Sequence, residues 1–160
     1  MLSVNIICVG KLKEKYLTDA IKEYSTRLSA FCKFSIVELS EYSLPEKPSQ
    51  AQIDKALSEE GKEIIKRLSK NSFVVPMCIE GKQLSSEELS EKISDAAVMG
   101  KSAVDFIIGS SFGLAPEVKA RGDMRLSMSK MTFPHQLARV MLSEQIYRAF
   151  QMSSGGKYHK

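Results

Sequence analysis

Residues that could bind an aromatic, polar ligand gather in one short stretch near the end of the chain. This stretch consists of Met128, Ser129, Lys130, Met131, Thr132 and Phe133. Pro134 follows, and proline favours the first turn of a helix. The unpaired N–H groups of a loop and helix start can bond a ligand's acceptors, and thioethers with Phe133 offer an apolar wall to a ring such as adenine. On spacing alone, a loop that lines the core explains the same residues, so both interpretations stay open.

A glycine-rich turn, Gly109–Gly113, lies between an apolar run and a short helix, which is where α/β sheets bind ligands. It lacks the third glycine of a dinucleotide fingerprint and the Gly-Lys-Ser/Thr of a P-loop. It fits the G-x-S-x-G pattern of the α/β hydrolases, with Ser111 as nucleophile and Asp123 and His135 following in their order. The chain after Ser111 is short for such a hydrolase. A turn without a ligand is a third interpretation.

Basic residues are concentrated at the end of the chain. From Lys130 onward there are five basic residues and one acidic residue, whereas the other 129 residues hold 18 of each. A balanced body with a basic end indicates a surface for a polyanion. Arg139 and Arg148 are nine residues apart, on one face of the expected last helix, and suit phosphate oxygens. His135, in its first turn, favours a structural role, whereas His159 in the tail is a candidate proton carrier, because an unperturbed histidine titrates near neutral pH.

Strands and helices are predicted to alternate along the whole chain. We expect strands at 2–9, 34–39, 73–79, 104–108 and 124–127, and helices at 15–28, 53–68, 85–99, 116–121 and 134–152. This order predicts one α/β domain over residues 1–160, with a parallel sheet. Pro76 indicates an edge or a bend in its strand.

Apolar residues of the last helix spread around most of its circumference, which a small domain rarely buries alone. We therefore expect a symmetric homodimer. No apolar run approaches the roughly 20 residues that cross a bilayer, so no membrane association is expected. Cys8, Cys32 and Cys78 are widely spaced, which favours a reducing cytoplasmic location and no metal site.

Several motifs together resemble the SPOUT-class methyltransferases that modify N3 of a pseudouridine in 23S ribosomal RNA. The likeness spans the chain and is most specific in two strings, Ser-Lys-Met-Thr-Phe-Pro-His-Gln at 129–136 and the closing Tyr-His-Lys at 158–160. It is also carried by the opening Ile-Ile-Cys-Val-Gly-Lys-Leu-Lys-Glu-Lys-Tyr, by Ile-Glu-Gly-Lys at 79–82 and by Glu-Gln-Ile-Tyr-Arg-Ala-Phe at 144–150. The sequence departs from the family pattern in three places. Ser110 replaces a usual glycine, Cys78 replaces a common acidic residue, and the residues 153–157 before Tyr158 differ from the family's usual sequence.

The resemblance implies a C-terminal trefoil knot, an exception to the rule against knots, and an obligate homodimer. It also implies S-adenosylmethionine as the cofactor, without a metal. The cofactor contacts would fall on Met77, on Gly109 and on the run from Met128 to Phe133. The implied substrate is 23S rRNA in the helix 69 loop of the assembled ribosome, and no DNA partner is implied.

For the chemistry we expect His159 to act as the base or proton relay, with Tyr158 against the target base. Arg148 and Lys160 would hold phosphate or stabilise the deprotonated imide, while Arg139 and Lys157 would contact RNA. The short tail is expected to complete the pocket of the partner subunit. The alternatives from other classes are a serine hydrolase that uses Ser111 and a non-catalytic RNA-binding dimer.

Overall fold

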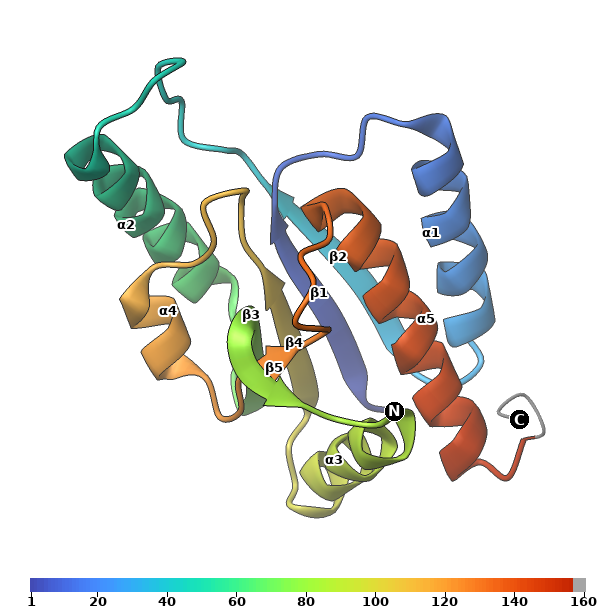
Figure 1. The fold of residues 1–160 in the computed structure, drawn as a ribbon. Helices are drawn as coiled ribbons and strands as arrows, with labels where there is room; N and C mark the ends of the chain where they lie inside the picture. Colours follow the sequence, from blue (N-terminus) through green and yellow to red (C-terminus); the bar gives the residue numbers. More distant parts are fainter. Residues whose placement is uncertain (157–160) are drawn as a thin grey trace.

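Five parallel strands form one sheet in the order β2-β1-β4-β3-β5 (Figure 1). The computed structural model describes residues 1–156. The strands are β1 (Ser3–Val9), β2 (Lys33–Leu39), β3 (Ser72–Gln83), β4 (Ala103–Ile108) and β5 (Leu126–Ser127). The helices are α1 (Lys15–Leu28), α2 (Gln50–Arg67), α3 (Ser86–Val98), α4 (Pro116–Arg121) and α5 (His135–Ser153). The predicted α/β class and parallel sheet are confirmed.

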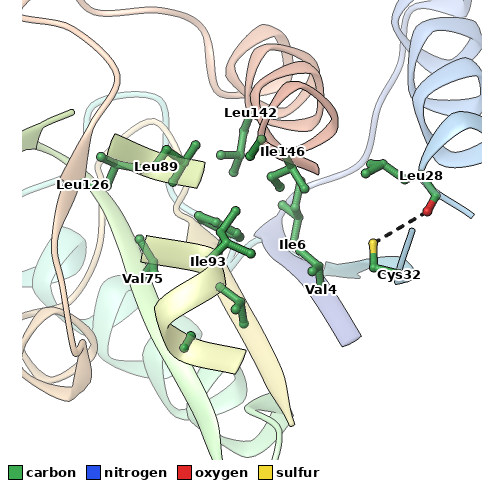
Figure 2. Packing of buried hydrophobic residues seen from close by; sticks show 14 of the residues in the cluster. Val4, Ile6, Leu28, Cys32, Val75, Leu89, Ile93, Leu126, Leu142 and Ile146 are labelled. Atoms are coloured by element: carbon green, nitrogen blue, oxygen red, sulfur yellow. Dashed lines mark hydrogen bonds between the residues drawn. The ribbon is translucent and has the colours of Figure 1, made fainter. Parts of the chain in front are cut away.

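Helices cover both faces of the sheet, because alternate residues of each central strand point to opposite sides. On β1, Val4 and Ile6 pack with α1, α3 and α5, while Ile7 and Val9 pack with α2 and α4. Figure 2 shows Leu142 and Ile146 of α5 above the first of these faces, among other members of the same buried cluster. The sheet is thus the middle of three layers, and this explains why β4 is buried along its whole length.

Side-chain hydrogen bonds at the N-cap residue fix where α2 and α3 begin. Ser49 caps α2 and forms a capping box with Gln52, so the helix begins at Gln50, three residues before the predicted start. Ser85 and Glu88 make the same arrangement at α3, as their spacing predicts. Burial of Ile64 on α2 and of Leu89 and Ile93 on α3 then fixes the face that each helix turns to the sheet.

Pro76 lies in the part of β3 that pairs with a strand on one side only. It pairs with Ile107 of β4 in the strand register, and β5 joins the other side of β3 only from Met77 onward. Before that point the free side of β3 is covered by Asp123, whose carboxylate accepts from Val74 N at 2.8 Å. The missing N–H of Pro76 faces this same side, two residues after Val74, so it removes no ladder hydrogen bond.

The last helix lies between α1 and α3 and packs on both (Figure 1). Its deepest side chains, Leu142, Ile146 and Ala149, are buried against the sheet. Neighbouring helices cover part of the remaining apolar circumference, and Leu137 keeps 38% of its surface exposed. Contacts within one chain therefore bury part of the apolar surface of α5. The predicted dimer would have to cover the apolar surface that remains exposed, such as the side chain of Leu137.

Among residues 1–156, no helix has the length and apolar character needed to cross a bilayer.

Candidate active site

A cavity of about 690 Å³ opens at the carboxyl end of the sheet. Its walls come from the end of β3, from the turn after β4, and from the segment that joins β5 to α5. Segments far apart in the sequence thus meet at the edge where parallel α/β sheets bind ligands. The apolar part of the lining consists of Met77, Ile79, Ile108, Phe112, Leu114, Met128, Met131, Phe133, Pro134 and Ala138.

The turn after β4 is held tightly. Gly113 N donates to Ser110 O at 2.9 Å, and the two residues form an isolated antiparallel bridge. Gly113 has a φ of +90°, which favours glycine. A side chain at Gly109 would collide with the Gly113 carbonyl. Glycine at position 109 is therefore required by the turn itself, whatever binds in the cavity.

The segment before α5 is shaped by its own hydroxyl groups. Ser129 Oγ accepts from Met131 N at 3.0 Å, and Ser127 Oγ donates to Ser129 O at 3.0 Å. No side chain caps α5, whose N-cap residue is Pro134. The first N–H groups of α5 are therefore without a side-chain acceptor at the wall of the cavity, where they can bind a ligand's acceptor atoms.

Charge in the cavity wall is concentrated in one ion pair. Lys119 of α4 donates to Glu80 of β3 at 2.5 Å. This hydrogen bond lowers the pKa of the Glu80 carboxyl below its ordinary value. Burial raises the pKa of the nearby Cys78 thiol. At neutral pH the wall therefore carries a balanced charge pair beside a neutral thiol.

The structure brings most predicted cofactor residues to this cavity. Seven of them line it: Met77, Gly109, Met128, Ser129, Met131, Thr132 and Phe133. Lys130 is exposed and is not part of the lining. Its side chain is thus placed outside the predicted cofactor site.

Sequence reasoning missed several contributors to the wall, among them Glu80, Leu114, Lys119 and Ser127. Leu114 follows the glycine turn directly, and Ser127 directly precedes the predicted run, so adjacency alone could have found both. Glu80 and Lys119 are 39 residues apart and meet through the contact between β3 and α4. No local pattern indicates that pairing.

The predicted phosphate contact of Arg139 is wrong for this fold. Its side chain is buried, Nη1 pairs with Glu38 at 2.6 Å, and Nη2 donates to the Gly10 carbonyl at 3.1 Å. Helical spacing put Arg139 and Arg148 on one face, but the Arg139 side chain points to Glu38 on β2 and to Gly10, just after β1. A guanidinium held in this way is not available to RNA.

The other predicted catalytic and RNA-binding residues lie at or beyond the end of α5. Arg148 is partly exposed and pairs with Glu144 at 2.7 Å, one turn earlier on the helix. Lys157, Tyr158, His159 and Lys160 lie outside the described residues.

The hydrolase arrangement is not assembled. Ser111 and His135 both line the cavity, but Asp123 is exposed and its carboxylate bonds the backbone of β3 at Val74. Ser111 lacks the positive φ of a strained nucleophile turn, since Asn71 is the only non-glycine residue in the range 1–156 with one. Asp123 is therefore a structural residue, and the predicted Ser-Asp-His triad lacks its acidic member.

A buried carboxylate supports the glycine turn from α2. Glu60 accepts from Tyr42 N at 3.0 Å and interacts with the Ser110 hydroxyl. Burial raises the pKa of the Glu60 carboxyl, and the bonds from Tyr42 and Ser110 oppose that rise. Serine at position 110 thus ties the turn to α2, a bond that glycine cannot make. Within residues 1–156, no cluster of His, Cys, Asp and Glu could hold a metal ion.

A family model and two full-length relatives identify the family of this chain. Residues 2–159 match the family model described as a predicted SPOUT methyltransferase. The chain is 50% identical to the putative ribosomal RNA large subunit methyltransferase H of Methanococcus maripaludis, over 99% of this chain and 100% of that protein. It has the same identity and coverage with the ribosomal RNA large subunit methyltransferase H of Clostridium acetobutylicum.

A more distant likeness agrees in fold. A probable methylase family protein from Haemophilus influenzae superposes with a TM-score of 0.54 at 16% identity, over 98% of this chain and 70% of that one. The full-length family match and the 50% identity over nearly the whole chain settle the assignment. The chain belongs to the SPOUT methyltransferase family.

Proposed function

We propose that the protein transfers a methyl group from S-adenosylmethionine to N3 of a pseudouridine in 23S rRNA, in the helix 69 loop of the assembled ribosome. The observation that carries this proposal is the cavity at the carboxyl end of the sheet, whose lining joins Met77, Gly109 and the segment from Met128 to Phe133. The names of the relatives, which are large-subunit rRNA methyltransferases, support the choice of substrate.

The lining suits the adenine ring of the cofactor. Met128 and Phe133 offer apolar surface to the adenine ring, while backbone N–H groups at the start of α5 can bond its acceptors. The bound cofactor supplies an electrophilic methyl group on a sulfonium. The described cavity therefore needs to orient two reactants, which contributes on the order of 7–11 kcal/mol in the best aligned cases.

The target nitrogen must lose a proton as its new bond to carbon forms. We assign that proton to His159, as base or relay, with Tyr158 packed on the target base and Arg148 and Lys160 near its charge or phosphates. A positioned base adds a factor of roughly 10²–10⁴. Lys157 would contact RNA beside them.

We further propose that the C-terminal segment is threaded as a trefoil knot and that the active form is a homodimer. The segment from β5 to α5 closes the cavity against β3 and the glycine turn, which is the region that such a knot would brace. The exposed side chain of Leu137 offers apolar surface for a second copy. The tail of one chain would then complete the cavity of the other.

Calorimetry with S-adenosylhomocysteine tests the cofactor site. We expect one binding event per chain in the wild type, and a roughly two- to tenfold weaker affinity for Met131→Ala, which removes a thioether from the rim. Met99→Ala is the matched control, because Met99 is similarly exposed at the end of α3 and lies outside the lining. No heat with the wild type contradicts the proposal, and RNA binding without cofactor binding would favour a non-catalytic RNA-binding dimer.

A further inference from the structure

The loop between β1 and α1 carries two exposed lysines beside the cavity. Lys11 and Lys13 are exposed, and neither forms an ion pair with any of residues 1–156. Lys15 at the start of α1 pairs with Asp19 at 2.6 Å, and Glu14 is the one acidic residue of the loop. The ammonium groups of Lys11 and Lys13 are thus exposed to solvent.

Two hydrogen bonds join this loop to the first turns of α5, and a third joins it to β2. Arg139 donates to the Gly10 carbonyl at 3.1 Å. Glu38, which pairs with Arg139, also accepts from Leu12 N at 3.1 Å. Lys13 N donates to the Gln136 side chain at 3.4 Å. The main chain of the loop is therefore tied to α5 on both sides of Lys11, while the lysine side chains stay free.

The anchoring places the lysines at the border of the cavity. His135, which lines the cavity, has its Nε2 3.6 Å from the point that a Cβ on Gly10 would occupy, and a Glu41 carboxylate oxygen is 2.8 Å from the same point. The loop lies at the carboxyl end of the sheet, as do the turn after β4 and the start of α5 (Figure 1). A substrate that reaches the cavity past His135 therefore passes the loop that carries the two lysines.

The distribution of charge agrees with a polyanion at this place. Residues 1–33 hold six basic and three acidic side chains. Of the basic residues from position 130 onward, Arg139 is buried and Arg148 is paired with Glu144, which reduces the free charge that the sequence places there. Lysine binds phosphate as a point charge without a fixed geometry, which suits a backbone contact.

We infer that Lys11 and Lys13 form a phosphate-binding surface that holds the rRNA backbone next to the target nucleotide, with Arg139 positioning the loop that carries them. This inference rests on the proposed function. It assigns the first loop of the chain a role in substrate binding and none in cofactor binding, since neither lysine lines the cavity.

The test compares Lys11→Gln/Lys13→Gln with Lys70→Gln/Lys92→Gln in methylation of large ribosomal subunits. The control pair removes the same charge from exposed lysines, Lys70 just before β3 and Lys92 on α3. For the loop variant we expect kcat/KM to fall about tenfold at about 0.1 M salt. The slope of log KM against log salt concentration should decrease by roughly 1.5–2, because two phosphate contacts are lost. The control should keep wild-type values, and Lys11→Arg/Lys13→Arg should restore most of the activity.

Calorimetry separates this inference from the proposed function. Affinity for S-adenosylhomocysteine should be the same in all four proteins. If the wild type methylates the subunits and the loop variant matches the control in kcat/KM and salt dependence, the phosphate surface is contradicted. If the wild type binds no cofactor and transfers no methyl group, the proposed function itself fails.

Discussion

At the scale of single residues, one buried arginine joins three parts of the chain. Arg139 on α5 bonds the end of β1 through the Gly10 carbonyl and the end of β2 through Glu38. Its own carbonyl accepts from Ser143 Oγ at 2.8 Å, inside the helix. A buried cation is tolerated here because it is paired and bonded, and loss of one partner leaves the other without compensation.

Replacement of Arg139 by Met should therefore destabilise the fold. We expect the free energy of unfolding to fall by about 2–4 kcal/mol, somewhat less than for a fully buried pair because Glu38 keeps 35% of its side chain exposed. Urea unfolding measures the change. Lys66→Ala, which removes an exposed pair with Glu63, is the control and should cost less than about 1 kcal/mol. Equal losses in the two variants would contradict the structural role of Arg139.

A second residue-scale prediction concerns the buried carboxylate under the glycine turn. Burial raises the pKa of Glu60 above its ordinary value of 4.5, so the folded state holds the proton more tightly than the unfolded chain. The stability that this group contributes is fully present below pH 4.5 and is lost as pH rises through the folded pKa. Glu60→Gln keeps an acceptor for Tyr42 N and removes the titration.

We expect the Gln variant to gain stability relative to the wild type as pH rises from 4 toward 8. All other titrating groups are common to both proteins, so the difference between their unfolding free energies isolates Glu60. Denaturant unfolding at several pH values gives this difference directly. A difference that stays constant with pH would mean that the Glu60 pKa is the same in the folded and unfolded chains.

At the scale of elements, the position of β5 controls the wall of the cavity. β3 shifts its register between Met77 and Lys82, and its second half pairs with β5. The shift brings Gly81 against the backbone of β5, where an added Cβ would lie 2.8 Å from the carbonyl carbon of Leu126. Ser127, the next residue of β5, already lines the cavity, so a displacement of β5 would also move the cavity wall.

Gly81→Ala should thus push β5 away from β3. We expect a loss of about 1–3 kcal/mol in stability, the usual cost of overpacking, together with a weaker affinity for S-adenosylhomocysteine. Ser49→Ala is the control, because it removes the cap of α2 at a cost of about 1 kcal/mol and Ser49 is not part of the cavity lining. If both variants lose stability and keep wild-type affinity, β5 does not position the cofactor site.

The elements themselves were largely predictable, because their signals are local. Capping residues such as Ser85 and the apolar, β-branched run of β1 act within a few neighbours, and the apolar β4 indicated a strand covered on both faces. The glycine turn and the segment before Pro134 could be found because they carry unusual residue types.

What could not be predicted depends on contacts between distant segments. The burial of Arg139 follows from Glu38, 101 residues away, and the Glu80–Lys119 pair follows from the contact between β3 and α4. A helical projection shows on which face of a helix a residue lies, but it does not show which other elements cover that face. The start of α2 was placed three residues late because the cap at Ser49 lies in a proline-containing loop.

At the scale of the whole molecule, the proposed dimer predicts a shared active site. The assembly should have twice the chain mass of 17.8 kDa in sedimentation equilibrium. A chain that ends at Gly156 lacks the tail, and Thr132→Trp fills the cavity with bulk; each alone should be inactive. Mixed dimers should recover activity, because one of their two sites combines an intact cavity with an intact tail. Stable mixed dimers without activity would place both parts in the same chain.

The central claim is tested most directly by methyl transfer to ribosomes. Purified ribosomes that lack the modification are incubated with the protein and S-adenosylmethionine labelled in its methyl group, and the labelled nucleotide is mapped by nuclease digestion and mass spectrometry. We expect one labelled position in 23S rRNA, at N3 of a pseudouridine in the helix 69 loop. Label on another nucleotide, or none from folded protein that binds the cofactor, would contradict this claim.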